Sequence, residues 1–401
     1  MSTLAGVNLA DFYRDLHEHP ELSRQEHRTA GKLAEALASL GYEVTTGVGG
    51  TGVVALLRNG DGPTVMLRAD MDALPIEEQT GLSYTSKVPG VMHACGHDMH
   101  VTCLVGAAEK LLADKDSWTG TLMLVCQPAE ETTTGARAMV ADGLFERFGK
   151  PDIVLGQHVC PLPAGMLGYG TGPVMAGSDS VRVTLHGRGG HGSRPETTVD
   201  PVLMAANVVV RLQGIVAREV PPAETAVVTV GKLHAGTKDN IIPETAELDI
   251  NMRTYTRQTR DLVRAAIERI VRAEAAASGA PKDPEIDWHN SAPVLVSDPD
   301  STTRTVEAFT GHFGADKLMV LPVVTGSEDI GIFGDAAGVP TVFWFWGGLE
   351  FDVVVKAIQE GGIEALPSNH SPVFAPLIEP TLSTGVDALC VAALTWLGQR
   401  G

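Results

Sequence analysis

Residues 93–100, His-Ala-Cys-Gly-His-Asp-Met-His, bring together three imidazoles, one thiol and one carboxylate. Cys95 and His97 are separated only by Gly96, so both side chains can turn towards one point. The apolar stretch 101–112 follows and predicts a helix. A thiolate and an imidazole at a helix start suit a borderline-soft divalent ion such as zinc, manganese, nickel or cobalt. The alternative is a polar helix cap that contains histidines by chance, but this density of ligand types favours a metal site.

Adjacent carboxylates at Glu130 and Glu131 indicate a second piece of chemistry. Two neighbouring acids repel each other unless a cation or separate tasks hold them together. One of them can bind a metal ion while the other acts as a general base towards water, whose pKa an ion lowers from about 16 to about 7. The alternative is a solvated acidic loop.

The candidate ligands are five in number, too many for one tetrahedral ion with an open position: Cys95, His97, Glu131, His158 and His370. They suit two ions that share a bridging ligand and lie about 3.5–4 Å apart, an arrangement that serves hydrolysis. The chain has neither the His-Glu-x-x-His helix of one class of zinc protease nor the Gly-x-Ser-x-Gly turn of serine hydrolases. We therefore expect a pair of co-catalytic ions.

The elements that must position these residues form an α/β pattern. Unbroken apolar runs at 64–69, 121–126 and 152–157 predict strands, and acids or histidines follow each of them. Such strands, separated by helices, indicate a mainly parallel mixed sheet with helices on both faces. Ligands bind beyond the carboxyl ends of parallel strands, where these polar residues fall.

The two ends of the chain add further elements. We expect helices over 8–19 and from about residue 25, and we interpret His17, His19 and His27 as solvated surface residues. Towards the other end, the pattern predicts a helix over 327–336, a strand over 340–346 that Gly347 and Gly348 break, and a last helix over about 380–397.

The middle of the chain has a different rhythm. Strands are expected at 180–186, 225–233, 245–254 and 283–289, and helices at about 199–213 and 257–278. This β-α-β-β-α-β order is that of a ferredoxin-like, split βαβ domain. We therefore predict a larger, discontinuous domain, 1–177 and 290–401, with a complete small domain inserted at 178–289.

Composition limits the possible partners and location. The chain has 401 residues, 44% of them hydrophobic, with 30 basic and 49 acidic side chains and a net charge of −19. This balance argues against nucleic acid or an anionic membrane as partner. We find neither a secretory signal nor an apolar run that approaches the length of about 18 residues needed to cross a membrane. Five scattered cysteines favour a cytoplasmic setting.

Eight segments, in order along almost the whole chain, resemble the amidohydrolase branch of the two-metal metallopeptidases, which includes hippurate hydrolases, N-acyl-amino-acid amidohydrolases and auxin-conjugate hydrolases. The resemblance implies that 1–177 and 290–401 form a catalytic domain like that of the zinc exopeptidases. It also implies that the insert, 178–289, is a lid and dimerisation domain through which a homodimer or dimer-based oligomer forms. The segments are residues 17–22, 68–75, 93–100, 127–131, 156–158, 189–192, 327–329 and 369–372.

The resemblance also implies a role for individual residues. The five candidate ligands would hold two divalent ions, with Cys95 bridging, and Glu130 would be the general base. His191 would polarise the scissile carbonyl, often across a dimer, and Asn240 and Arg253 would hold the substrate's carboxylate. Three acids would orient the ligands from behind: Asp70, Asp72 and Asp98.

These expectations lead to an enzyme that hydrolyses the amide bond of N-acyl amino acids. A dipeptidase or aminopeptidase on the same scaffold is the alternative, and a binding protein that kept the fold is a more distant one. The glycines of 187–192 match a dinucleotide-binding fingerprint, but Pro195 follows closely and no acid ends a strand near residue 212. Glu196 stands where the family often has a histidine, so the substrate preference of the insert stays open.

Overall fold

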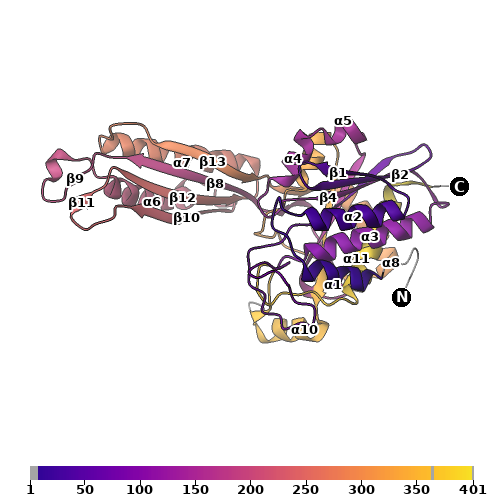
Figure 1. Cartoon of the computed structure of the whole chain (residues 1–401). Coiled ribbons are helices and arrows are strands. Elements are labelled where there is room, and N and C mark those ends of the chain that lie inside the picture. The colour runs from indigo at the N-terminus through magenta and orange to yellow at the C-terminus, as the bar shows by residue number, and fades with distance from the viewer. Residues whose placement is uncertain (1–7, 363–364, 400–401) are drawn as a thin grey trace. The chain divides into compact units, whose positions relative to one another are not determined.

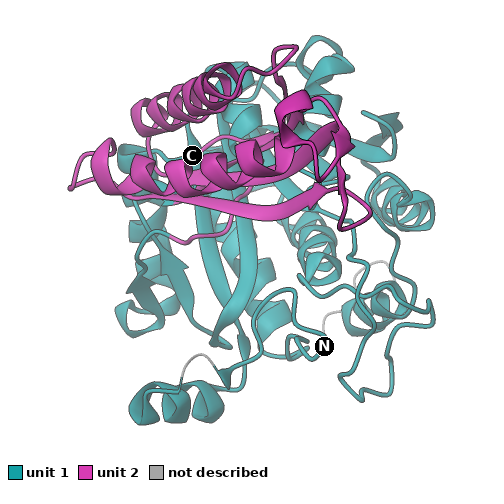
Figure 2. Ribbon diagram, turned by 90° about the vertical axis from the view of Figure 1, so that its left-hand side faces the viewer, with its two compact units in different colours: residues 1–174, 296–323, 329–401 teal, residues 175–295, 324–328 magenta. Residues whose placement is uncertain are grey.

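The computed structural model describes residues 8–362 and 365–399, and the chain divides into two compact units (Figure 2). Unit 1 comprises Met1–Val174, Val296–Val323 and Asp329–Gly401, and unit 2 comprises Met175–Leu295 and Val324–Glu328. The predicted insert, 178–289, falls inside unit 2. The chain passes between the units in β7 (Gly172–Met175) and β14 (Leu295–Ser297), which pair with each other, and again on either side of residues 324–328.

Unit 1 is built on one mixed sheet, nine-stranded over the described residues. The four strands β4, β3, β5 and β16 are parallel to one another, and β1 and β2 pair antiparallel with their neighbours, whereas β6 pairs antiparallel with β16 and parallel with β15. The prediction of a mainly parallel mixed sheet is confirmed. In spatial order the strands are β1 (Glu43–Val48), β2 (Gly52–Asn59), β4 (Trp118–Gln127), β3 (Thr64–Asp70), β5 (Ile153–Pro163), β16 (Thr341–Leu349), β6 (Leu167–Tyr169) and β15 (Leu318–Val320), with β17 (Gly398–Gln399) beside β4.

Helices cover both faces of this sheet (Figure 1). On one face α3 and α11 pack against each other and against the central strands, and on the other α4 contacts α9. Nearly every side chain of α3 is buried, because the helix is enclosed by the sheet, α1, α2 and α11. The helices of unit 1 are α1 (Leu9–Glu18), α2 (His27–Ser39), α3 (His97–Ala113), α4 (Gly135–Ala141), α5 (Leu144–Phe148), α8 (Pro299–Phe313), α9 (Gly331–Ala337), α10 (Phe351–Glu360) and α11 (Thr381–Trp396), with short 3₁₀ turns at Ala315–Lys317 and, in unit 2, Pro195–Thr197.

Two expectations for the C-terminal third are wrong. The helix predicted from residue 327 begins only at Gly331, because Asp329 is turned inwards to accept a hydrogen bond from Gln127 at 2.6 Å. The strand β16 continues through Gly347 instead of ending there. A Cβ on Gly347 would lie 1.8 Å from the carbonyl oxygen of Pro163, so this glycine permits a close approach of two strands and does not break one.

Unit 2 confirms the predicted ferredoxin-like fold. Its four strands are all antiparallel and lie in the order β10, β12, β8, β13, with α6 and α7 packed on the sheet. A small ribbon of β9 and β11 extends beyond the end of β8 where His186 pairs with Thr245. The elements are β8 (Gly177–His186), β9 (Gly190–His191), α6 (Pro201–Arg218), β10 (Ala226–Ala235), β11 (Ile241–Ile242), β12 (Thr245–Thr254), α7 (Arg257–Ala277) and β13 (Glu285–Ala292).

Helix α6 departs from one expectation. It is 18 residues long and, by length and composition alone, apolar enough to cross a membrane. Met204, Ala205 and Val208 bury one face of it in the core of unit 2, together with residues of α7 and the sheet. Its apolar character thus exceeds what packing on one side requires, since Leu203 and Val210 are exposed.

Candidate metal centre

The turn before α3 places Cys95 and His97 on the same side of the chain. Gly96 adopts a left-handed conformation with φ of 84°, and a Cβ there would lie 2.4 Å from Cγ1 of Val159. Only glycine is accommodated without displacing that valine. The turn brings the thiol of Cys95 and the imidazole of His97, both buried, to the carboxyl-end edge of the sheet.

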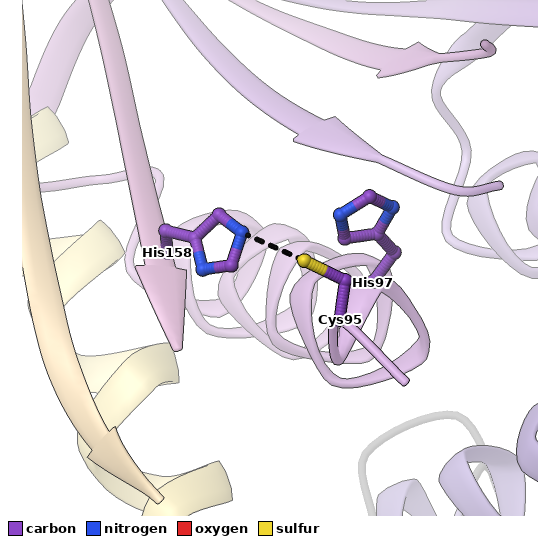
Figure 3. Close-up of side chains that lie close together, drawn as sticks. All are labelled: Cys95, His97 and His158. Atoms are coloured by element: carbon purple, nitrogen blue, oxygen red, sulfur yellow. Dashed lines mark hydrogen bonds between the residues drawn. The ribbon is translucent and has the colours of Figure 1, made fainter. Parts of the chain in front are cut away.

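A first ligand group consists of Cys95, His97 and His158, whose ligand atoms all lie within 4.8 Å of one another (Figure 3). Strand β5 carries His158, and its Nε2 is 3.4 Å from Sγ of Cys95. The Nδ1 of His158 donates to the carbonyl of Val159 at 2.7 Å, and the Nδ1 of His97 donates to the carbonyl of Asp72 at 2.8 Å. A carbonyl can only accept, so Nδ1 carries the proton in both rings and Nε2 keeps the lone pair that a metal ion needs.

A second ligand group consists of Cys95, Glu131 and His370, also within 4.8 Å of one another. The Nε2 of His370 lies 3.3 Å from Oε1 of Glu131. His370 has a left-handed φ of 69°, and its N–H donates to the carbonyl of Ala94 at 2.8 Å. Asn369 donates from Nδ2 to the carbonyls of Cys95 and Val159, at 3.1 Å each, which fixes the loop against both ligand-bearing segments. Cys95 is common to the two groups.

The electrostatics of the two groups favour a bound cation. The buried Nε2 of His97 has no hydrogen-bond partner among residues 8–362 and 365–399. Hydrogen bonding to Cys95 and Glu131 raises the pKa of His370 to about 10. The side chains of Cys95 and Glu131 therefore already stabilise a positive charge at this position. Burial raises the pKa of the Cys95 thiol, and a metal ion would reverse that effect by binding the thiolate. A thiol, three imidazoles and a carboxylate therefore fit two ions of the zinc, manganese, nickel or cobalt type.

Glu130 adjoins the ligands on a tightly folded loop after β4. Its carboxylate is buried and lies within 4.8 Å of the ligand atoms of both His97 and Glu131. The loop turns through Ala129, whose φ is 50°, and closes when Gly135 donates to the carbonyl of Ala129 at 3.1 Å. This position is suitable for a base that takes a proton from water next to the metal site.

The three acids predicted to orient the ligands behave differently from one another. Asp72 contacts two ligand residues, because it accepts from His97 and also from the N–H of Glu131 at 3.0 Å. Asp70 contacts His100 at 2.5 Å. Burial by itself would raise the pKa of Asp70, but Arg68 and the nearby histidines outweigh it and hold that pKa well below the usual range. Asp98 has no hydrogen bond to a ligand side chain among the described residues; it bonds to His17 and to the N–H of Met99.

His17 is the residue that sequence reasoning misjudged, since it is completely buried instead of solvated. Its Nδ1 lies 2.6 Å from Asp98 and its Nε2 3.3 Å from Glu78. Burial by itself would lower the pKa of His17, but the two carboxylates raise it to about 10. A signal was available, because Tyr13, Leu16 and His17 share the buried face of α1. His19 is half-buried and His27 is exposed.

The remaining candidates lie in unit 2. His191 is on β9, and its Nδ1 accepts a hydrogen bond from the N–H of Ser193 at 3.1 Å. Asn240 lies nearby, since its carbonyl accepts a hydrogen bond from the N–H of Gly192 at 2.9 Å. Arg253 is near the other end of the sheet, on β12, eight residues beyond Thr245 and therefore on the order of 26 Å along the strand. One copy of unit 2 does not bring Asn240 and Arg253 to the same carboxylate.

Comparisons with known proteins agree with this architecture. Residues 66–356 match the model of peptidase family M20/M25/M40. The chain is 41% identical to a hippurate hydrolase of Campylobacter jejuni over 79% of this chain and 82% of the relative. It is 38% identical to thermostable carboxypeptidase 2 of Saccharolobus solfataricus, with 83% and 84% covered. A dinuclear metal-binding peptidase of Bacillus subtilis superposes with a TM-score of 0.78 at 31% identity, over 96% of both chains. The chain therefore belongs to peptidase family M20/M25/M40, as a metal-dependent amidohydrolase.

Proposed function

We propose that the enzyme hydrolyses the amide bond of N-acyl amino acids and releases a carboxylic acid and a free amino acid. The observation that carries this proposal is the pair of ligand groups that share Cys95 beside the buried carboxylate of Glu130. The similarity to a hippurate hydrolase supports the substrate class, because that relative's name describes an N-acyl amino acid hydrolase.

Glu130 has the central role in the proposed reaction. Two divalent ions held by Cys95, His97, Glu131, His158 and His370 would supply a Lewis acid and lower the pKa of water. Glu130 takes one proton from the attacking water and passes it to the leaving nitrogen as the carbon–nitrogen bond breaks. The carbonyl of Asp72 accepts a hydrogen bond from Nδ1–H of His97. This bond keeps His97 in the tautomer whose Nε2 is free for the ion.

We also propose that the working form is a homodimer joined through unit 2. Strand β10 is an edge of its sheet, and Val227 and Leu233 are exposed on it, as are Leu203 and Val210 on α6. An edge strand with exposed apolar neighbours is a surface that a second chain can cover. In such a dimer His191 and Asn240 of one chain and Arg253 of the other would serve one active site, which the spacing within a single chain does not allow.

The setting of the enzyme is proposed to be cytoplasmic. All five cysteines are free, and four of them are buried. Free thiols without disulfides suit a reducing compartment.

A substrate panel tests the reaction. Purified protein would be stripped of metal, resupplied with manganese, zinc, cobalt or nickel, and offered N-acetyl, N-benzoyl and long-chain acyl amino acids together with simple dipeptides. We expect metal-dependent release of amino acid from the acylated substrates. Silence across the panel in metal-loaded protein would overturn the proposal and favour a binding function.

A peptidase is the second candidate, and one observation favours it: 38% identity to a thermostable carboxypeptidase. The panel separates the two functions. Release from dipeptides but not from N-acyl amino acids would assign the enzyme to peptide hydrolysis.

A further inference from the structure

The loop that carries Glu130 is tethered at Ala129, the residue immediately before it. The N–H of Ala129 donates to Oε1 of Glu26 at 2.9 Å. Glu26 lies 103 positions earlier in the chain, directly before α2, and its side chain is fully buried. A carboxylate at the start of one helix thus fixes the backbone that begins the turn to Glu130.

This tether acts on a residue whose conformation needs support. Ala129 has a φ of 50°, a region that residues with a Cβ rarely adopt unless the surroundings impose it. The other bonds of the loop hold it from the far side of Glu130, since Thr134 and Gly135 donate to the carbonyl of Ala129. The bond to Glu26 therefore holds the loop on the side that leads from β4.

Glu26 is itself held rigidly. Oε1 also accepts from the N–H of Arg24 at 2.8 Å, and Oε2 accepts from the hydroxyl of Thr51 at 2.5 Å. Three donors from three different segments leave the carboxylate little freedom to move. A small displacement of Glu26 would consequently be transmitted to Ala129.

The same short segment supports the metal ligands by a separate route. Ser23 donates to Oδ2 of Asp72 at 2.6 Å, and Asp72 in turn contacts His97. Segment 23–26 therefore has two arms: Ser23 leads to a ligand and Glu26 leads to the base. Loss of one arm should have a different kinetic consequence from loss of the other.

We propose that Glu26 is a positioning residue that aims the carboxylate of Glu130 by fixing the backbone of Ala129. It touches neither substrate nor metal, and its effect is exerted entirely through its hydrogen bond to Ala129. The inference rests on the proposed function, because it assumes that Glu130 is the general base.

Three substitutions at one position test whether the hydrogen bond or the charge matters. Glu26→Gln keeps an oxygen that can accept from Ala129 and Arg24, and its amide nitrogen can meet the Thr51 hydroxyl. Glu26→Asp keeps the charge but is one methylene too short, and Glu26→Ala removes the acceptor. We expect Glu26→Asp and Glu26→Ala to lower kcat by about 10–100-fold at unchanged KM and metal content, and Glu26→Gln to stay near the wild type.

Two further variants serve as controls. Thr51→Val removes one of the three bonds to Glu26 but leaves the bond to Ala129, so kcat should fall less than in Glu26→Asp. Ser23→Ala should weaken metal affinity instead, measured by competition with a chelator. If Glu26→Ala does not fold, the comparison of Glu26→Asp with Glu26→Gln decides alone.

The inference is overturned if Glu26→Asp is as active as Glu26→Gln, or if loss of activity in either shortened variant tracks loss of metal. Failure of the proposed function is a separate outcome. In that case the wild type would release no amino acid from the substrate panel, whereas failure of this inference leaves wild-type turnover and its loss in Glu130→Gln intact.

Discussion

At the scale of single residues, the proposed reaction gives Cys95 and Glu130 complementary roles. Cys95 belongs to both candidate ligand groups, so its thiolate would contact both proposed ions. Glu130 is placed so that its carboxylate approaches the ligand atoms without belonging to the group of His370. We therefore propose different tasks for the neighbouring Glu130 and Glu131, and substitution can separate these tasks.

Glu130→Gln should retain its bound metal but lose turnover by about 10²–10⁴-fold, since a carboxamide cannot take a proton from water. Metal content by elemental analysis and kcat on an N-acyl amino acid provide the measurement. Glu131→Gln, one position away, is the matched control and should lose metal together with activity. Normal turnover by Glu130→Gln would show that another group is the base.

His17 should make stability depend on pH above neutrality. Its folded pKa of about 10 exceeds the ordinary value of 6.5, so its contribution is complete below pH 6.5 and is lost as the pH rises through 10. We expect the difference in unfolding free energy between wild type and His17→Gln, measured with denaturant on metal-free protein, to shrink from pH 6.5 to 10. The exposed His27, changed to Gln, is the control, and a pH-independent difference for His17→Gln would contradict the buried ion pairs.

At the scale of elements, the sheet brings its ligands together through the ends of its strands and the loops that follow them. Apolar runs predicted β3, β4 and β5, and therefore the shared edge where Asp70, Glu130 and His158 meet. The order of elements in unit 2 was equally accessible, and β12 has the predicted bounds, 245–254. These elements could be predicted because the spacing of apolar residues along the local sequence indicates which side chains of a strand or helix are buried.

Other features could not be predicted, because they depend on contacts between distant segments. Glycine at 347 looks like a strand break in the sequence, yet it is needed because Pro163 of the neighbouring strand lies against it. Glutamate is usually exposed to solvent, and only the fold shows that Glu26 is buried and hydrogen-bonded to Ala129. His17 likewise contacts two distant residues, because Asp98 and Glu78 lie 81 and 61 positions further along the chain.

The loop of Glu130 should tolerate no side chain at Gly135. A Cβ there would lie 1.6 Å from the carbonyl oxygen of Pro128, so Gly135→Ala forces the loop open. We expect a loss of about 1–3 kcal/mol in unfolding free energy and a fall in kcat. Gly31→Ala is the control, because nothing lies within 4 Å of its Cβ in α2 and alanine there should stabilise the protein by roughly 1 kcal/mol. Equal behaviour of the two variants would refute the close contact.

At the scale of the whole molecule, the candidate site residues are distributed over both units. Unit 1 holds every candidate metal ligand, and unit 2 holds His191, Asn240 and Arg253. The net charge is −19, and exposed apolar side chains of α6 and β10 form the surface that we propose a second copy covers. Assembly and activity are therefore expected to be linked.

Val210→Asp should dissociate the proposed dimer, because it introduces a charge on the exposed face of α6. Val320→Asp is the matched control on unit 1, since Val320 is 72% exposed and Val210 73%. Sedimentation velocity should show a monomer for Val210→Asp and a dimer for both the wild type and the control. We expect kcat to fall only in the monomer, and a wild type that is monomeric and fully active would contradict this arrangement.

We propose that two ions held around Cys95 carry the hydrolysis. The most direct measurement adds cobalt or manganese stepwise to metal-free protein and follows both bound metal and the release of amino acid from an N-acyl substrate. We expect activity to be absent at the start and to reach its plateau at about two ions per chain. Activity without metal, or a plateau at about one ion per chain with the second ion without effect, would contradict the two-ion site.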